Sequence, residues 1–185
     1  FNKSLKCICR AGAGVNHIPI DMATERGVVV FNTPGGNANA VKELVICGLL
    51  LSSRGIIQGH QFAQTLSNQD ADELTHLVET NKKNFKGNEL KGKTIGIIGL
   101  GAIGSLLAQS VVSMDMKVIG YDPNISIDAA WQLPKEVVKA DNLKDLLSNS
   151  DYISIHVPLV EETKNLISND VIKFIKPGAK LINLS

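Results

Sequence analysis

The chain has 185 residues, 44% of them hydrophobic, which suffices for one globular domain or for one domain and part of a second. Its 19 basic and 18 acidic residues leave a net charge of +1 without a basic block, so we expect neither nucleic acid nor an anionic membrane as a partner. The longest apolar run, residues 44–51, is far shorter than the roughly 20 residues that span a bilayer.

The three cysteines, Cys7, Cys9 and Cys47, are odd in number and lack the spacing of metal ligands. Cys7 and Cys9 alternate along an apparent strand and should point to one face. We expect all three to be buried as small hydrophobic side chains, in a reducing, cytoplasmic setting. Because the chain starts at Phe1 and stops at Ser185 directly after an apparent strand, we expect it to be an interior piece of a longer protein.

The N-terminal part predicts a β-α-β unit. Residues 5–9 form a short apolar run ahead of a glycine-rich turn at residues 10–17. Pro19 suits the first turn of a helix and Gly27 its end, and residues 28–31 read as the second strand. A connection this short implies parallel strands with a right-handed crossover.

Two helices are predicted in the middle of the chain. After a loop of turn formers at residues 32–37, residues 41–64 read as one long helix. The first half of this helix is apolar nearly all round, which indicates burial between domains or subunits. Residues 70–83 predict a second, amphipathic helix with acidic residues in its first turn.

From residue 94 onward strands alternate with helices. The predicted strands are residues 94–99, 117–121, 152–157 and 180–183, and the predicted helices are residues 102–114, 143–147 and 168–174. This alternation predicts an α/β fold with a Rossmann-type, doubly wound parallel sheet.

The sequence Gly99-Leu-Gly-Ala-Ile-Gly104 carries the main functional signal, because it follows an apolar strand and opens a helix. In this context Gly99 permits a tight turn, Gly101 lets a pyrophosphate approach the backbone, and Gly104 allows close packing of helix on strand. Asp122 ends the next strand, 18 residues after Gly104, where a carboxylate accepts hydrogen bonds from ribose hydroxyls and repels a 2′-phosphate. The motif therefore predicts NAD rather than NADP. Ordinary turn glycines and a surface aspartate are the alternative.

A second motif is rejected. Residues 87–94 fit the P-loop formula G-x-x-x-x-G-K-[ST], but polar residues precede them and a strand follows. A P-loop needs a strand before it and a helix after it, so that the helix N-terminus faces the phosphates. We interpret this match as accidental.

The turn at residues 10–17 lies at the carboxyl end of a parallel strand, where open α/β sheets bind ligands. Its small residues would expose N–H groups to an anion, and Arg10 could add a charge-assisted contact. A connecting loop with a solvated arginine is the alternative. His156 closes a strand near the cofactor but has no carboxylate partner, so we interpret it as structural. We assign no chemistry to the other histidines, His17, His60 and His76, and we predict no metal site.

Blocks along the whole chain resemble the D-2-hydroxyacid dehydrogenase family. They are Arg10–His17, Asn32–Pro34, Asn37–Leu44, Gly99–Gly104, Tyr121–Pro123, His156–Leu159 and Ile182–Asn183. Within the family, residues 37–44 and the Arg-Ala-Gly-x-Gly-Val turn are most similar to the D-3-phosphoglycerate dehydrogenase branch. Leu184-Ser185 departs from the pattern, because the family usually has small residues after Asn183.

The resemblance implies two domain segments. Residues 1–36 would be the C-terminal part of the first half of a split, flavodoxin-like substrate domain. Residues 37–185 would be linker helices and an NAD-binding Rossmann domain, truncated before the catalytic residues. The long helix would lie near a dimer contact, in a homodimer or homotetramer.

The resemblance also implies the site residues. Arg10 and the backbone amides of Ala13 and Gly14 would bind an anionic substrate. The cofactor contacts would be Thr33, Gly99, Gly101, Ala102, Ile103, Gly104, Asp122, Val157, Pro158, Leu184 and Ser185. The catalytic arginine, glutamate and histidine of the family would begin just after Ser185, so we expect no catalytic residue in this chain and no activity from it alone.

The expected reaction of the parent protein is hydride transfer between NAD and a D-2-hydroxy acid. By resemblance the substrate is 3-phosphoglycerate, oxidised to 3-phosphohydroxypyruvate in the first step of serine biosynthesis. The alternatives are a reductase of glyoxylate or hydroxypyruvate, and a non-catalytic, NAD-sensing protein similar to a corepressor.

Overall fold

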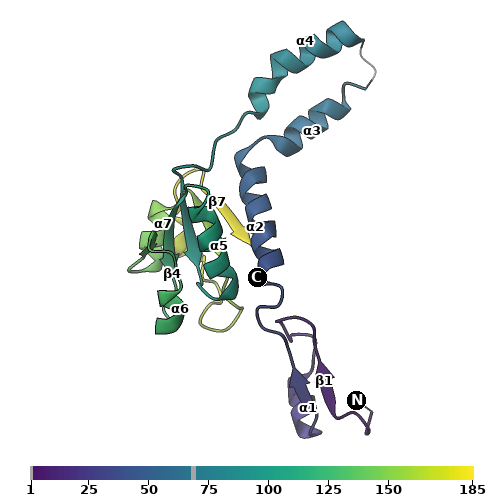
Figure 1. Ribbon diagram of the computed structural model, residues 1–185, viewed down its shortest axis with the longest axis vertical. Coiled ribbons are helices and arrows are strands. Elements are labelled where there is room, and N and C mark those ends of the chain that lie inside the picture. The colour runs from purple at the N-terminus through teal and green to yellow at the C-terminus, as the bar shows by residue number, and fades with distance from the viewer. Residues whose placement is uncertain (1, 68–69) are drawn as a thin grey trace.

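The computed structural model describes residues 2–67 and 70–185. Figure 1 shows three parts along the long axis: a small two-stranded lobe, an α/β domain with helix α2 beside it, and a helical arm at the opposite end. No helix in the described part of the chain has both the length and the apolar character needed to cross a membrane.

The small lobe contains β1 (Cys7–Cys9), α1 (Ile20–Glu25) and β2 (Val29–Phe31). Its two strands are parallel, as predicted, and Gly27 ends the helix region with a φ of +66°. Helix α1 follows directly from Pro19, which stands at its N-cap. The predicted β-α-β unit is therefore confirmed.

The prediction that the cysteines are buried is wrong, because all three are exposed. Cys7 and Cys9 share one face of the two-stranded sheet with Val29 and Phe31, their partners in register, and that face is exposed. Cys47 lies two residues from both Val45 and Leu49, and therefore on a different side of its helix from these buried residues. The apolar character of a cysteine favours burial, but only where another element covers it.

The predicted single long helix is two helices, α2 (Ala38–Ser53) and α3 (Ile56–Gln64). Arg54 between them is extended, with φ −120° and ψ 144°. The backbone of Phe85 packs against this break, because the N–H of Gly55 donates a hydrogen bond to the carbonyl oxygen of Phe85 over 3.1 Å. A Cβ on Gly55 would lie 2.8 Å from the Cα of Phe85, so only glycine permits this approach. A contact distant in sequence thus interrupts a helical pattern.

The arm consists of α3, α4 (Ala71–Asn81) and the 3₁₀ turn η1 (Lys82–Phe85). Asp70 caps α4 by accepting a hydrogen bond from the N–H of Glu73 over 2.9 Å, in agreement with the predicted helix start. The rings of Phe62 and Phe85 join the two sides of the arm, with centroids 5.4 Å apart. Neither α3 nor α4 contains a buried residue.

The α/β domain is built on one parallel sheet with strand order β5-β4-β3-β6-β7. The strands are β3 (Thr94–Ile98), β4 (Lys117–Tyr121), β5 (Val137–Lys139), β6 (Tyr152–Ile155) and β7 (Lys180–Asn183). The helices are α5 (Ala102–Val112), α6 (Ile127–Trp131), α7 (Leu143–Asn149) and α8 (Asn169–Ile172). The doubly wound Rossmann sheet is confirmed. Strand β5 and helix α6 were not predicted.

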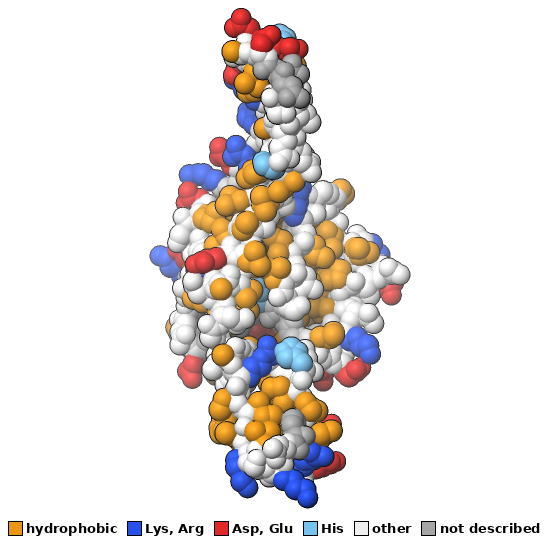
Figure 2. All heavy atoms as spheres, turned by 90° about the vertical axis from the view of Figure 1, so that its right-hand side faces the viewer, with side chains coloured by type: hydrophobic (Ala, Val, Ile, Leu, Met, Phe, Trp, Pro, Cys, Tyr) orange, Lys and Arg blue, Asp and Glu red, His pale blue; other side chains and the backbone are white. Residues whose placement is uncertain are grey.

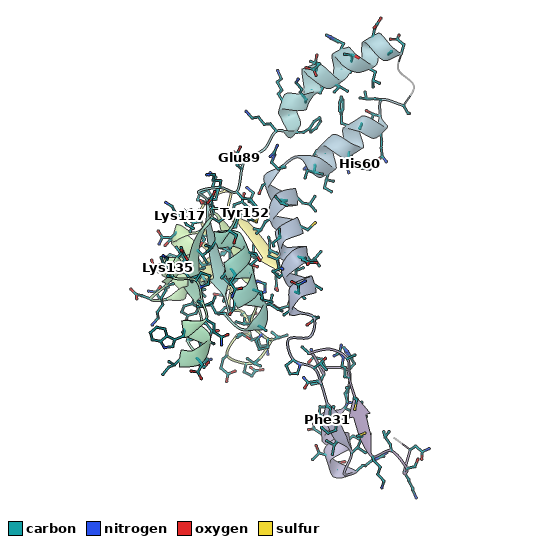
Figure 3. All side chains as sticks on the ribbon, in the orientation of Figure 1. Phe31, His60, Glu89, Lys117, Lys135 and Tyr152 are labelled. Atoms are coloured by element: carbon teal, nitrogen blue, oxygen red, sulfur yellow. The ribbon has the colours of Figure 1, made fainter. Side chains whose placement is uncertain are left out.

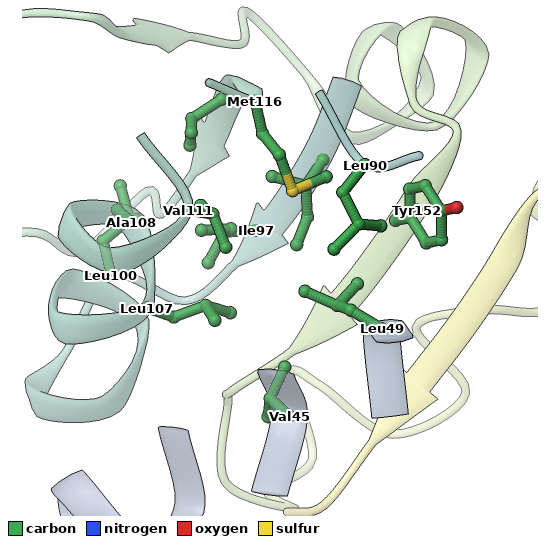
Figure 4. Packing of buried hydrophobic residues seen from close by; sticks show 12 residues of the cluster. Val45, Leu49, Leu90, Ile97, Leu100, Leu107, Ala108, Val111, Met116 and Tyr152 are labelled. Carbon is green, nitrogen blue, oxygen red and sulfur yellow. The ribbon is translucent and has the colours of Figure 1, made fainter. Parts of the chain in front are cut away.

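The core consists of two clusters, one on each face of the sheet. In Figure 4, Val45 and Leu49 of α2 face Leu107 of α5 and Tyr152 of β6. The hydroxyl groups of Tyr152 and Ser53 lie 2.7 Å apart and connect β6 to the end of α2. Helix α2 is therefore part of the Rossmann core on one face, while its other face is exposed.

The P-loop match is confirmed as accidental. No helix follows Thr94, which begins β3. Gly87 instead packs on the backbone of α2, where a Cβ would overlap the carbonyl oxygen of Ser53.

Candidate functional site

The turn between β3 and α5 has the close packing that its glycines predict. Gly99 adopts a φ of +90°, and a Cβ there would lie 2.7 Å from the carbonyl oxygen of His156. Gly104 is buried, and its Cβ would overlap the carbonyl oxygen of Gly99. Both positions therefore require glycine, and the helix lies directly on the end of the strand.

Gly101 has the opposite surroundings, because a Cβ there would meet nothing within 4 Å. It is the N-cap of α5 and provides no side chain to the first turn, where Ala102 is exposed and Ile103 is half-buried. The first N–H groups of a helix carry a partial positive charge and bind phosphate. The open space and these N–H groups together form a cradle that could hold an anionic group.

Asp122 lies at the end of β4, directly beside this turn. One carboxylate oxygen accepts a hydrogen bond from the N–H of Leu100 over 2.9 Å, and the other accepts from the N–H of Asn124 over 3.0 Å. Because a carboxylate has about four acceptor positions, about two remain for further hydrogen-bond donors. The hydrogen bond to Leu100 fixes the carboxylate relative to the glycine-rich turn.

The turn that contains Arg10 folds around this side chain. The guanidinium atoms lie 3.5 Å from the Cβ positions that Gly12 and Gly14 would have, so the arginine packs closely against both glycines. Its Nη1 is buried without a hydrogen-bond partner among the described residues. The amide of Asn32 donates to the carbonyl of Ala13 over 2.7 Å, and this bond joins the turn to the chain that leaves the lobe.

The lobe and the Rossmann domain meet at the start of α5. A Cβ on Gly35 would lie 3.5 Å from the Cβ of Ala102. Thr33 is exposed two residues before this contact, and its N–H donates to the carbonyl of Gly12 over 3.1 Å. The structure thus places Thr33 between the arginine turn and the glycine-rich turn.

Several of the remaining predicted cofactor residues lie in one cavity of about 330 Å³ at the carboxyl end of β6 and β7. Val157, Pro158 and Ser185 line it, whereas Leu184 is an exposed side chain beside Ser185. The hydroxyl group of Ser185 donates to the carbonyl of Ile155 over 3.0 Å, which holds the end of the chain against β6.

Sequence reasoning missed Thr163, which also lines this cavity. Its hydroxyl group donates to the carbonyl of Pro158 and accepts from the N–H of Val160 over 2.9 Å, so it fixes the loop that contains Pro158. A threonine a few residues after a proline in a loop was the available signal, since its hydroxyl group can bond to nearby backbone groups.

His156 is half-buried at the end of β6. Its Nε2 lies 2.8 Å from the hydroxyl oxygen of Ser154, while its Nδ1 is buried without a partner among the described residues. Burial lowers the pKa of His156 from 6.5 to about 4, so the imidazole is neutral near pH 7. It is thus a structural group with one hydrogen bond made and one ring nitrogen free.

This pKa gives the fold a pH dependence. The unfolded chain binds a proton at His156 below pH 6.5, whereas the folded chain does so only near pH 4. The contribution of His156 to the free energy of unfolding is therefore fully present above pH 6.5, and it is lost as the pH falls from 6.5 toward 4. We expect the free energy of unfolding in urea to fall by about 3 kcal/mol across this window from this group. His156→Asn should show a shallower dependence of this free energy on pH. His60→Asn, at an exposed position of α3, should keep the slope of the unchanged chain. Equal slopes in all three proteins would contradict the assignment.

The parallel sheet, the glycine-rich cradle and the carboxylate at the end of β4 define a dinucleotide-binding Rossmann domain. Residues 48–185 match the family described as D-isomer specific 2-hydroxyacid dehydrogenase, NAD binding domain. The chain belongs to this family, and its cofactor is NAD. The open cradle at Gly101 and the free acceptor positions of Asp122 fit this cofactor.

Relatives extend over nearly the whole chain. The chain is 39% identical over 181 residues to D-3-phosphoglycerate dehydrogenase of Archaeoglobus fulgidus, covering 98% of this chain and 32% of that protein. It is 38% identical over 181 residues to hydroxypyruvate reductase of Thermotoga maritima, covering 98% of this chain and 53% of that protein. Among solved structures, D-lactate dehydrogenase of Aquifex aeolicus complexed with NAD and lactic acid has a TM-score of 0.75 at 29% identity, covering 97% of this chain and 49% of that one. The chain thus spans about a third of the phosphoglycerate dehydrogenase it matches.

Proposed function

We propose that the protein containing this chain oxidises 3-phosphoglycerate at its 2-hydroxyl group, with NAD as the acceptor of the hydride. The observation that carries the substrate assignment is the buried, unpaired Nη1 of Arg10. A buried N–H donor without a partner among the described residues is costly, and an anionic group of the substrate would supply the partner. D-3-phosphoglycerate dehydrogenases among the relatives support the same substrate.

The residues of this chain would bind and orient the reactants. Arg10 would contact the anionic substrate, and the N–H groups of Ala13 and Gly14 would donate to its carboxylate. Neither of these N–H groups donates a hydrogen bond within residues 2–67 and 70–185, and both residues are exposed. Thr33 would face the nicotinamide side of the cleft, because it lies between the two turns.

The cofactor would extend along the carboxyl ends of the strands. Its pyrophosphate would lie on the cradle at Gly101, against Ala102 and Ile103, and its ribose on Asp122. Val157 and Pro158 would line the adenosine pocket, while Leu184 and Ser185 would approach the nicotinamide. We assign residues 1–36 to a substrate domain and residues 37–185 to linker helices and the NAD-binding domain.

The proton transfer would come from outside this chain. His156 does not fit the role, because its neutral ring is hydrogen-bonded to Ser154 and its other nitrogen is buried. We therefore expect the family's catalytic arginine, glutamate and histidine to follow Ser185 in the parent protein, and this chain alone to be inactive. We place the protein in the cytoplasm, where serine is synthesised from 3-phosphoglycerate.

The direct test is NADH formation by the intact parent protein from 3-phosphoglycerate and NAD, with NADP and D-lactate as controls. Turnover with NAD and 3-phosphoglycerate is the expected result. Turnover on unphosphorylated acids alone would instead favour a reductase of hydroxypyruvate or glyoxylate, as the Thermotoga relative suggests. Tight binding of NADH without turnover on any acid would favour the NAD-sensing protein.

Arg10 gives a sharper test of the substrate. We expect Arg10→Ala to raise the KM for 3-phosphoglycerate roughly 10- to 100-fold, which corresponds to the loss of one charged hydrogen bond. The affinity for NADH, measured by fluorescence titration, should change little. Arg54→Ala, an exposed arginine between α2 and α3, is the matched control. An unchanged KM in Arg10→Ala would contradict the phosphorylated substrate.

We also propose that the protein is a homodimer through α2 and the arm. Figure 2 shows hydrophobic side chains gathered on the exposed face of the molecule. On α2 and α3 this face includes Leu44, 56% exposed, with Leu50, Leu51, Ile56 and Ile57. The helices α3 and α4 of the arm contain no buried residue and so bury little apolar surface by themselves, and a second copy would cover them.

A further inference from the structure

A second cavity, of about 470 Å³, lies beside β4 and β5. Its apolar walls include Leu100, Ile125, Leu133 and Val137, which all belong to the core cluster under α5. Small-molecule sites have about this volume and a largely apolar lining. The cavity shares no lining residue with the one that contains Val157 and Pro158, so it is a separate site in the described part of the chain.

One rim of this cavity is unusually apolar for a surface. Trp131, the only tryptophan of the chain, lines the cavity and is 83% exposed. Ile127, one helical turn earlier on α6, is 77% exposed. Large apolar side chains exposed together beside a cavity indicate a binding surface, and an indole ring offers a flat face to an aromatic ligand.

The charge at the cavity is positive. Lys135 and Lys139 line it, and Figure 3 shows Lys135 on the side of the domain away from α2. Asp122 is the only carboxylate among the lining residues, and each of its oxygens already accepts a backbone N–H. Two ammonium groups beside an apolar cavity fit a ligand with an aromatic body and an anionic group.

We propose that this cavity binds a small aromatic carboxylate or sulfonate. The ring lies among Leu100, Ile125 and Val137, against the indole of Trp131, and the anionic group pairs with Lys135 and Lys139. The cavity adjoins the proposed cofactor site, because Asp122, whose carboxylate would bind the ribose, is one of its lining residues.

Leu100 connects the cavity to the cofactor site. This part of the inference rests on the proposed function, because it assumes that NAD binds at Asp122. Its backbone N–H donates to Asp122, while its side chain forms a wall of the cavity. A Cβ on Gly120 would lie 2.8 Å from the Cδ1 of Leu100, so the side chain has little room to move toward β4. A ligand that displaces Leu100 therefore also displaces the hydrogen-bonded carboxylate. The affinity for NAD then falls as the concentration of the cavity ligand rises, and this decrease reaches a plateau once the cavity is saturated.

The binding test follows the single indole N–H of Trp131 by ¹⁵N NMR of the full chain, with naphthalene-2-sulfonate as the probe. We expect saturable shifts of this signal and of the amides of Leu100 and Gly120. The uncharged 2-naphthalenemethanol should bind about tenfold more weakly, because it lacks the charge-assisted contact. The absence of a saturable shift at millimolar probe, or equal affinity for the two compounds, would overturn the proposal.

Two variants locate the site. Lys135→Ala/Lys139→Ala should raise the Kd of the sulfonate about tenfold, whereas the control Lys144→Ala/Lys173→Ala, at the lysines above the ring of Phe174, should not. Ala130→Phe, which fills the cavity from exposed α6, should abolish the Trp131 shift while the rest of the spectrum stays dispersed. If the lysine variant binds as tightly as the unchanged chain, the proposed site is wrong.

NADH titrations at several probe concentrations test the connection. A Kd for NADH that rises to a plateau supports it. A Kd that rises without limit shows direct competition in the cofactor cleft and overturns the separate site. If the chain does not bind NADH at all, the Rossmann assignment fails, while the Trp131 titration still decides whether the cavity binds the anion.

Discussion

Gly104→Ala is expected to destabilise the fold by about 3 kcal/mol and to abolish NADH binding. The added methyl group would overlap the carbonyl oxygen of Gly99, a backbone atom that cannot move without displacing the turn and the start of α5. Urea unfolding followed by circular dichroism measures the first effect, and fluorescence titration measures the second.

Gly101→Ala is the matched control, because a Cβ at this position meets nothing within 4 Å. Its free energy of unfolding should stay within about 0.5 kcal/mol of that of the unchanged chain. Its affinity for NADH should still fall about tenfold or more, because the methyl group occupies the space reserved for the pyrophosphate. Equal stability of the two variants would contradict the packing, and unchanged affinity in Gly101→Ala would contradict the cradle.

Leu49→Ala is expected to lower the free energy of unfolding by about 2–5 kcal/mol. Leu49 is fully buried between α2 and the sheet, near Leu107 and Tyr152 in Figure 4. The truncation removes apolar contacts and leaves a cavity that rigid neighbours on both sides cannot fill. Urea unfolding at a concentration where the chain is monomeric gives the value.

Leu44→Ala, on the exposed face of the same helix, separates folding from association. We expect its monomer to unfold within about 0.5 kcal/mol of the unchanged chain, because the side chain is 56% exposed. Its dimer dissociation constant, from sedimentation equilibrium, should rise about tenfold if a second copy covers this face. If Leu44→Ala lowered the monomer's free energy of unfolding as much as Leu49→Ala does, α2 would pack against the sheet through a different face.

The strands of the Rossmann domain were predictable from the sequence, because the patterns that indicate them are local. Strand β4 and strand β7 have the predicted bounds, and β3 and β6 differ from them only at their ends. Each is a short apolar run between turn formers, and the glycine-rich turn depends on spacing along a few residues. Short elements without such patterns were missed: β5 has three residues and α6 has five, next to prolines at positions 123 and 134.

The failed predictions share one cause. The break between α2 and α3 at Arg54–Gly55 depends on the backbone of Phe85, thirty positions further along the chain. The spacing of apolar residues along a helix cannot indicate such a contact. The exposure of Cys7 and Cys9 depends on which element covers the sheet face that they share. For His156, sequence pattern indicated a structural role but could not indicate the bond to Ser154 or the buried Nδ1.

The sequence by itself determined the fold class, the dinucleotide cradle and the carboxylate at Asp122, because backbone geometry at glycines and strand ends follows from neighbouring residues. Only the tertiary structure decided the burial of Arg10 Nη1 without a partner among the described residues, the neutral imidazole of His156 and the cavity beside Trp131. These properties arise from desolvation and charge among residues far apart in the chain, and such surroundings exist only once the elements have packed.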